Sequence, residues 1–127
     1  MTLNLLVVDD SSVMRRIILR SLKEAGITIG EFLEASNGYE GLSHLVDKKI
    51  DVVLCDLNMP EMDGLEFIQR VKELSLPQPV PIILITALAT DRRVHEGLNC
   101  GARDYILKPF TPEALLEKIK SVLAEPR

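Results

Sequence analysis

Residues 52–64, VVLCDLNMPEMDG, lead from an apolar run into an acid-rich loop that contains a proline. The apolar run Val52–Cys55 is typical of a strand that is buried on both faces of a parallel sheet. The run ends on Asp56, and Gly64 allows the chain to turn tightly into a helix. The carboxylate of Asp56 can serve here as a turn former, a metal ligand or a nucleophile. Residues elsewhere in the chain are needed to distinguish these three roles.

Short apolar runs like this one recur along the chain, and each is followed by a segment with helical spacing. Strands that alternate with helices in this way predict an α/β fold, a doubly wound parallel sheet with helices on both faces. Because no linker, repeat or low-complexity tract interrupts the pattern, residues 1–127 are expected to form one domain. The five expected strands are Leu3–Val8, Glu31–Ala35, Asp51–Cys55, Val80–Ile85 and Arg103–Leu107.

Capping residues, glycines and prolines mark the ends of the expected helices. Ser11 or Ser12 can cap the first helix, and Gly26 stands where it would stop. The fourth helix contains indifferent helix formers and is expected to be the least rigid. The expected helices run to Ala25 from the first cap, over Gly38–Val46, Gly64–Leu74 and Asp91–Cys100, and onward from Thr111-Pro112-Glu113; their inward positions include Val13, Ile17, Ile18, Leu22, Leu42, Leu45 and Val46.

The composition is that of a globular protein with an aliphatic core. Hydrophobic residues make up 46% of the 127 positions and charged residues 27%, whereas aromatic residues make up only 4%. The net charge of -4 argues against nucleic acid as the primary partner. Cys55 and Cys100 form no CxxC pair and are interpreted as reduced thiols. No signal peptide is expected, and no apolar run approaches the ~20 residues needed to cross a membrane, so a cytoplasmic location is expected.

Polar residues follow four of the five expected strands. In open parallel sheets the functional crevice lies beyond the carboxyl ends of the strands, so these residues are expected to converge. Three carboxylates and one ammonium then give the site a charge of about -2, which calls for a cation. Only oxygen ligands are on offer, and this favours Mg²⁺. The converging residues are Asp9, Asp10, Asp56, Thr86 and Lys108.

Each of these residues also has an ordinary structural explanation. Asp9 and Asp10 can cap the first helix, and Asp56 can form a turn. Thr86 can be a plain β-branched strand terminus, and Lys108 can be solvated, as most lysines are. A shared site nevertheless explains better why all of them fall at the same edge of the same sheet.

The same residues resemble those of a known family. Asp9-Asp10, the stretch DLNMPEMDG, Thr86-Ala87 and Lys108-Pro109-Phe110 have the order and spacing of the receiver domain of two-component response regulators. The similarity covers essentially the whole chain. Within the family, DDSSVMRRIILRSL and KPFT are most similar to the single-domain chemotaxis regulators. The resemblance implies a flavodoxin-like (βα)5 sandwich with strand order 2-1-3-4-5.

The resemblance implies that Asp56 accepts a phosphoryl group from a phosphohistidine on a sensor histidine kinase or a phosphotransfer protein. A carboxylate is a weak nucleophile, so catalysis must come from position and charge neutralisation. Mg²⁺ is expected to bind Asp10, the Asp56 carboxylate and the backbone carbonyl of Asn58, with Asp9 acting mainly through water. Lys108 is expected to pair with a phosphoryl oxygen.

The resemblance also implies a switch. Thr86 would hydrogen-bond the phosphoryl group, and Tyr105 would rotate into the space that the threonine leaves. The surface of the fourth helix, fifth strand and fifth helix would then change and control a downstream protein, with the flagellar motor switch as one candidate. Lys108-Pro109 would be a cis peptide. The protein is expected to be a monomer, with dimerisation on activation left open, and to contact neither nucleic acid nor membrane directly.

Two departures and ambiguities accompany the resemblance. Leu88 stands where enteric chemotaxis regulators carry an acid, so the rate of dephosphorylation and the partner surface are expected to differ from theirs, without a defined direction. The arginines of the first helix either dock an acidic kinase or phosphotransfer domain or form a solvated helix face. These arginines are Arg15, Arg16 and Arg20.

Several alternatives stay open. The sequence cannot separate a stand-alone regulator from a receiver that belongs to a longer protein with another output. A haloacid dehalogenase-like phosphatase would need a second aspartate where Asn58 stands, and an FMN carrier would need a Ser/Thr/Gly-rich loop where Asp9 and Asp10 stand. A receiver that no longer takes phosphate would not need the full set of polar residues.

Overall fold

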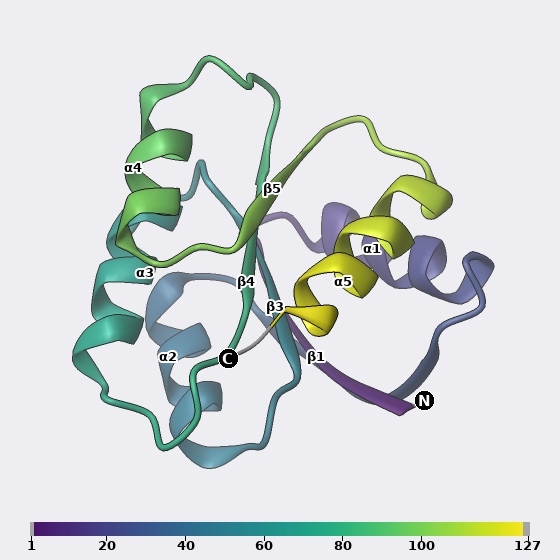
Figure 1. Ribbon diagram of the computed structural model, residues 1–127, viewed down its shortest axis with the longest axis horizontal. Helices are drawn as coiled ribbons and strands as arrows, with labels where there is room; N and C mark the ends of the chain where they lie inside the picture. The colour runs from purple at the N-terminus through teal and green to yellow at the C-terminus, as the bar shows by residue number, and fades with distance from the viewer. Residues whose placement is uncertain (1, 126–127) are drawn as a thin grey trace.

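The computed structural model of the chain describes residues 2–125, in which strands and helices alternate from end to end (Figure 1). Each helix follows a strand and returns the chain to the start of the next one, as parallel pairing requires. The elements are β1 Thr2–Val8, α1 Ser12–Glu24, β2 Thr28–Ala35, α2 Gly38–Asp47, β3 Val52–Asp56, α3 Gly64–Glu73, β4 Ile82–Thr86, α4 Arg92–Cys100, β5 Asp104–Leu107 and α5 Pro112–Ala124.

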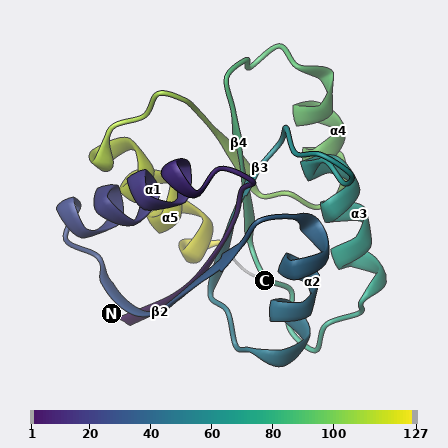
Figure 2. The ribbon, with the colours of Figure 1, turned by 180° about the vertical axis from the view of Figure 1, so that it is seen from behind.

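The strands form one parallel sheet in the order β2-β1-β3-β4-β5, which confirms the expected fold and strand order. Helices α1 and α5 cover one face of the sheet, and α2, α3 and α4 cover the other (Figures 1 and 2). The strand order reverses between β1 and β3. Such a reversal is where open α/β sheets bind their ligands.

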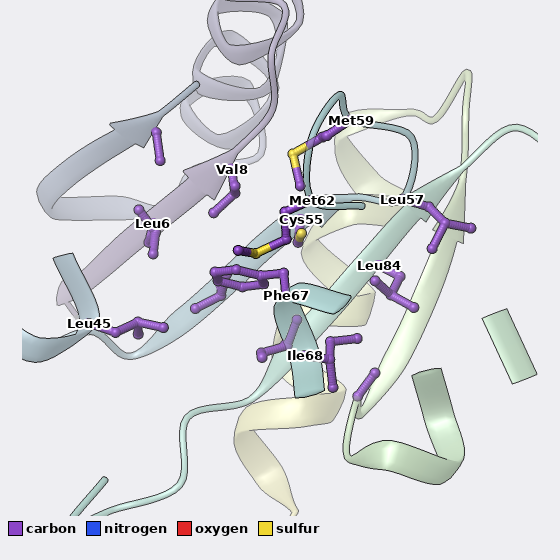
Figure 3. Packing of buried hydrophobic residues seen from close by; sticks show 14 of the residues in the cluster. Leu6, Val8, Leu45, Cys55, Leu57, Met59, Met62, Phe67, Ile68 and Leu84 are labelled. Carbon is purple, nitrogen blue, oxygen red and sulfur yellow. The ribbon is translucent and has the colours of Figure 1, made fainter. Parts of the chain in front are cut away.

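The core consists of two apolar layers, one on each side of the sheet. Successive residues of a strand point to opposite faces, so Leu6 and Val8 enter one layer while Leu5 and Val7 enter the other. Figure 3 shows Phe67 of α3 at the centre of the layer beneath α2, α3 and α4. All five residues of β3 are buried, including its last residue, Asp56.

The helices begin at side chains that cap their first turn. Each N-cap side chain accepts a hydrogen bond from a backbone N–H of the helix, which satisfies a donor that the helix itself leaves free. Because each helix follows a strand, the caps of α3 and α4 lie just beyond the carboxyl ends of β3 and β4. The caps of α1 to α5 are, in order, Ser11, Asn37, Asp63, Asp91 and Thr111.

Three of the positions that were expected to face the core are exposed. Val13 and Ile17 of α1 are 61% and 46% exposed, and Val46 of α2 is 65% exposed. The start of α1 at its Ser11 cap puts Ile18 and Leu22 on the sheet, and this leaves Val13 and Ile17 on an outer row of the same helix. The prediction of an inward orientation was therefore wrong for these three residues.

Two strand boundaries also differ from expectation by more than one residue. β2 begins at Thr28 rather than Glu31, because an edge strand pairs on one side only and does not need the continuous apolar run that was used to find it. β4 begins at Ile82 rather than Val80, after Pro81, which has no N–H to donate to a ladder. Among residues 2–125, no helix has both the length and the apolar character needed to cross a membrane.

Candidate functional site

Backbone hydrogen bonds fix the residues that follow the strand ends. The N–H of Asp9 donates to the carbonyl of Ala35 at 2.9 Å, which prolongs the pairing of β1 with β2. In the same way the N–H of Lys108 donates to the carbonyl of Thr86 at 2.9 Å. Asp56 is the last paired residue of β3 and lies opposite Ile85 of β4. The ladder thus holds the backbones of these residues in register along one edge of the sheet.

Three carboxylates meet at this edge, as the sequence predicts. One oxygen from each of Asp9, Asp10 and Asp56 lies within 4.8 Å of the others. Asp9 and Asp56 are buried, with 1% and 4% of their surface exposed, whereas Asp10 is exposed. Like charges at such separations repel one another, and burial strengthens the repulsion because water screens it less.

Asp9 carries the largest electrostatic penalty of the cluster. Burial raises the pKa of its carboxyl group from 3.8 to about 6, the hydrogen bond from the Ser11 N–H opposes the shift, and the charge of Asp56 adds to it. That hydrogen bond reaches Oδ1 at 2.9 Å. The other oxygen, Oδ2, is buried and has no hydrogen-bond partner among the described residues. An unpaired buried carboxylate oxygen is costly, and a cation beside it removes the cost.

Asp56 is partly compensated by a lysine. Burial raises the pKa of its carboxyl group, and the ammonium of Lys108 lowers it, as does the N–H of Asn58. The Nζ of Lys108 donates to Oδ1 of Asp56 at 3.3 Å, across the sheet from β5 to β3. The pKa nevertheless stays above its ordinary value, because one ammonium does not offset both the burial and the neighbouring acids.

The donor set fits a hard divalent cation. It consists of carboxylates from Asp9, Asp10 and Asp56, and one of their oxygens is buried without a partner. Such cations bind oxygen ligands and need few carboxylates when waters and phosphate oxygens complete the shell. Asn58 lies two residues beyond Asp56, with an exposed side chain whose Oδ1 accepts a hydrogen bond from Arg93. The expected role of its backbone carbonyl as a ligand stays a prediction.

Thr86 ends β4, and Tyr105 lies on the neighbouring strand β5. Thr86 is buried, and its hydroxyl both accepts from the N–H of Leu88 at 3.3 Å and donates to the Leu88 carbonyl at 3.4 Å. Tyr105 is half-buried, pairs with Leu84 in the ladder between β4 and β5, and has the Lys118 ammonium 5.4 Å from its ring centroid. The Lys108-Pro109 peptide bond is cis, as expected from the resemblance.

Sequence reasoning did not find the role of two arginines. Arg15 donates to the carbonyl oxygen of Asp9 and to Glu34, and its side chain is only 15% exposed, so it supports the acidic site from behind and is not available for docking. Arg93 of α4 contacts Asp91, Asp63 and Asn58. No periodicity or motif marks either residue, because the partners Glu34, Asp63 and Asn58 lie on other segments of the chain.

The sequence profile of the response regulator receiver domain matches residues 5–120 of this chain. The chain belongs to the response regulator receiver family. The match includes every polar residue of the site, from Asp9 to Lys108. This family assignment excludes the haloacid dehalogenase-like phosphatase and the FMN carrier, which belong to other families.

Named proteins and one solved structure show which receivers this chain is similar to. It is 44% identical over 123 residues to the chemotaxis protein CheY1 of Helicobacter pylori, and the match covers 95% of this chain and 97% of that protein. It is 39% identical over 119 residues to the phosphate regulon transcriptional regulatory protein PhoB of Pseudomonas aeruginosa, of which the match covers 51%. The structure of CheY4 of Vibrio cholerae superimposes with a TM-score of 0.84 at 33% identity and covers 97% of this chain and all of that one.

The receiver domain is therefore of the CheY type, and receivers of this type are signalling switches rather than metabolic enzymes. They carry an acidic pocket that binds Mg²⁺, and the cluster of Asp9, Asp10 and Asp56 corresponds to that pocket. Receivers of this type interact with histidine kinases and with downstream targets.

Proposed function

We propose that this receiver is a phosphorylation-controlled switch of chemotaxis in which Asp56 is the phosphoryl acceptor. The observation that carries the proposal is the surroundings of the Asp56 carboxylate. It is buried at the tip of β3, within 4.8 Å of two other carboxylates and 3.3 Å from the Lys108 ammonium. No other described aspartate combines a strand end, burial and a lysine partner.

The proposed reaction is a phosphoryl transfer from a phosphohistidine. An oxygen of the Asp56 carboxylate attacks the phosphorus, the phosphorus–nitrogen bond breaks, and the imidazole of the donor leaves with the electron pair. Lys108 already lies beside Asp56. Its ammonium can pair with a phosphoryl oxygen once the Asp56 carboxylate has been converted to the acyl phosphate. Because the nucleophile is weak, rate comes from holding these groups in place and neutralising charge.

The residues that would hold Mg²⁺ are Asp10 and Asp56, with the Asn58 carbonyl, while Asp9 would act through water. The unpaired Oδ2 of Asp9 and its raised pKa are the observations that support a cation here. When bound, the ion offsets negative charge on the incoming phosphoryl oxygens. Arg15 would keep Asp9 in place through the bond to its carbonyl oxygen.

The proposed output starts at Thr86. Its hydroxyl would exchange Leu88 for a phosphoryl oxygen, which empties space beside β5, and Tyr105 would turn inward. Beside Tyr105 lies a surface hollow of about 380 Å³ that Ile106, Phe110 and Lys118 help to line. A change in Tyr105 would reshape this hollow and so alter the affinity for a downstream protein. The two states need to differ by only a few kcal/mol for one phosphoryl group to shift the balance.

The proposed donor surface is the outer row of α1. Val13 and Ile17 are exposed on this helix, and Arg16 and Arg20 are exposed beside them. An apolar row flanked by cations fits an acidic kinase or phosphotransfer domain. The N-terminus of α1 follows Asp9 and Asp10 directly, so a partner that binds there can bring its phosphohistidine to Asp56.

The test is the response of the purified protein to Mg²⁺ and a small phosphodonor. With acetyl phosphate, intact mass spectrometry is expected to show the gain of one phosphoryl group, and chelation of Mg²⁺ or the Asp56→Asn substitution is expected to abolish it. The matched control is Asp51→Asn, an aspartate at the opposite end of β3. A phosphoryl group that persists in Asp56→Asn, or none in the native protein, would refute the proposal.

The chemotaxis assignment needs a second experiment. The similarity to PhoB shows that related receivers also belong to proteins with a transcriptional output, so the alternative is a receiver with another target. The phosphorylated and unphosphorylated proteins can be compared for binding to a purified flagellar motor switch protein from the same organism. Tighter binding of the phosphorylated form supports chemotaxis, and equal binding of both forms favours a different output.

A further inference from the structure

One arginine joins three segments that surround the proposed phosphorylation site. The guanidinium of Arg93 in α4 donates to both oxygens of Asp91, at 3.2 and 2.8 Å, and to Oδ2 of Asp63 at 3.4 Å. It also donates to the side-chain oxygen of Asn58. The Arg93 side chain is only 28% exposed. A planar fork of five N–H donors can make such a set of bonds, whereas an ammonium cannot.

Two of the three partners are helix caps. Asp63 caps α3 by accepting the N–H of Glu66 at 2.9 Å through Oδ1, which leaves Oδ2 for Arg93. Asp91 caps α4 by accepting the N–H of Arg93 itself at 3.0 Å. The guanidinium therefore ties the first turn of α4 to the first turn of α3 and to the loop that carries Asn58.

A continuous chain of hydrogen bonds leads from this arginine to Thr86. The N–H of Asp91 donates to the carbonyl of Leu88 at 3.2 Å. Leu88 is in turn bonded through its N–H and its carbonyl to the Thr86 hydroxyl. Ala87, Leu88 and Thr90 are exposed, so apolar burial does little to fix this loop. Its conformation rests on polar contacts, and Arg93 anchors their far end.

We propose that Arg93 is a positioning residue that restrains the loop between β4 and α4 in the arrangement where the Thr86 hydroxyl is engaged by Leu88. The inference rests on the proposed function, because it assumes that Thr86 must leave Leu88 to reach a phosphoryl oxygen. When the Thr86 hydroxyl moves away from Leu88, the Leu88 N–H loses its acceptor, so the loop has to change its conformation. Arg93 opposes that adjustment by holding Asp91 to Asp63 and Asn58. Removal of the guanidinium is therefore expected to favour the activated arrangement.

The first test uses the unphosphorylated protein and needs no phosphoryl chemistry. In Arg93→Ala, the backbone amide of Leu88 is expected to exchange with solvent several-fold faster than in the native protein, because its bond to Thr86 opens more often. The Asp91 cap bonds the backbone N–H of residue 93, so this substitution leaves the cap in place. Unchanged exchange at Leu88 would overturn the proposal.

The second test measures the affinity for beryllofluoride, a phosphoryl mimic, at saturating Mg²⁺. Arg93→Ala is expected to bind it roughly two- to fivefold more tightly, the range that corresponds to partly exposed ion pairs. Asp63→Asn keeps a capping oxygen but loses the charge, and is expected to change the affinity in the same direction by less. Weaker or unchanged binding in Arg93→Ala would show that the arginine does not restrain the loop. Loss of packing alone would not produce tighter binding.

The matched control is the neighbouring arginine. Arg92 has the same charge on the same helix, but its side chain is 89% exposed and forms an ion pair with Glu96 at 3.7 Å. Arg92→Ala is therefore expected to match the native protein in both tests. Arg93→Lys keeps the charge without the fork and is expected to behave like Arg93→Ala. If Arg93→Lys behaved like the native protein, charge alone would account for the effect and the bridging role would be wrong.

The two tests separate this proposal from the proposed function. If the native protein failed to bind beryllofluoride, the phosphorylation proposal would fall, while the exchange rate of Leu88 would still report on the restraint. If the native protein bound it and Arg93→Ala bound it no more tightly, the restraint alone would fall.

Discussion

The Lys108 ammonium lies 3.3 Å from the Asp56 carboxylate, although Asp56 ends β3, Lys108 follows β5, and β4 lies between these two strands. The side chain of Lys108 is 25% exposed, whereas the side chain of Asp56 is 5% exposed. The lysine is thus the only described cation that contacts the buried carboxylate. This pair connects the electrostatics of the site to its chemistry.

The substitution Lys108→Met is expected to slow phosphorylation of Asp56 by at least about tenfold. It keeps the length of the side chain but removes the charge, so the pKa of Asp56 rises further and the phosphoryl oxygens lose a partner. The rate can be followed by intact mass spectrometry with acetyl phosphate at fixed Mg²⁺. Lys120→Met, on the exposed side of α5, is the control and is expected to react at the native rate.

Asp9→Asn is expected to stabilise the protein at pH 7 when no divalent cation is present. Burial raises the pKa of Asp9 from 3.8 to about 6. The folded state therefore holds the proton more tightly than the unfolded state, and this favours folding fully only below pH 3.8. The contribution is lost as the pH rises through about 6, and amounts to about 3 kcal/mol at about 1.4 kcal/mol per pKa unit.

Urea unfolding of both proteins across this pH range measures the effect. The native protein is expected to lose stability between pH 4 and 7 relative to Asp9→Asn, which keeps an acceptor for the Ser11 N–H. Addition of Mg²⁺ at pH 7 is expected to stabilise the native protein and to stabilise Asp9→Asn less. A stability difference that does not depend on pH would contradict the role of the Asp9 charge.

Tyrosine fluorescence is expected to report the switch directly. The sequence contains no tryptophan and only two tyrosines, so in the variant Tyr39→Phe the sole tyrosine is Tyr105. Mg²⁺ with beryllofluoride is expected to change its emission, because the ring moves from a half-exposed position toward the core. The added substitution Thr86→Ala is expected to abolish the change while leaving binding detectable. If the spectral change were the same with and without the Thr86 hydroxyl, the movement of Tyr105 would not depend on Thr86, which would contradict the proposed coupling.

Gly64→Ala is expected to disturb the site through the backbone. A Cβ at this position would lie 2.9 Å from the carbonyl oxygen of Asp56 and 2.9 Å from the Cα of Leu57, and neither backbone atom can yield without moving the end of β3. We expect a loss of roughly 1–3 kcal/mol in unfolding free energy, as for other overpacked sites, and weaker binding of Mg²⁺. Gly97→Ala is the control, because its closest contact is a Leu84 side-chain methyl that can turn aside. It is expected to retain Mg²⁺ affinity.

Much of this fold could be read from the sequence because burial and capping leave local signals. The apolar run before Asp56 marks a central strand, and Ser11 and Gly26 bracket α1 as expected. The convergence of Asp9, Asp10 and Asp56 follows from strand direction alone, since parallel strands end at one edge. Family resemblance, and not periodicity, supplied the strand order and the cis bond at Lys108-Pro109.

What the sequence did not reveal depends on contacts between distant elements. The outward orientation of Val13 and Ile17 is decided by the angular position of α1 on the sheet, which apolar spacing does not define when both sides of a helix carry aliphatic residues. The bonds of Arg93 to Asp63 and Asn58 join residues about one helix and one strand apart in the chain. An arginine on a helix gives no sign of whether it is solvated or bridging until its neighbours are known.

Because the site residues follow different strands, they are synthesised at different times as the chain leaves the ribosome. Asp9 and Asp56 are synthesised before Lys108, which follows β5, the edge strand that pairs with β4 in the described sheet. A nascent chain that still lacks β5 and Lys108 has the carboxylates of Asp9 and Asp56 without the lysine ammonium that pairs with Asp56. Under the proposed function such a chain would be a poor acceptor for a kinase in the same cell, so a signal would be received only after β5 has been synthesised and has paired with β4.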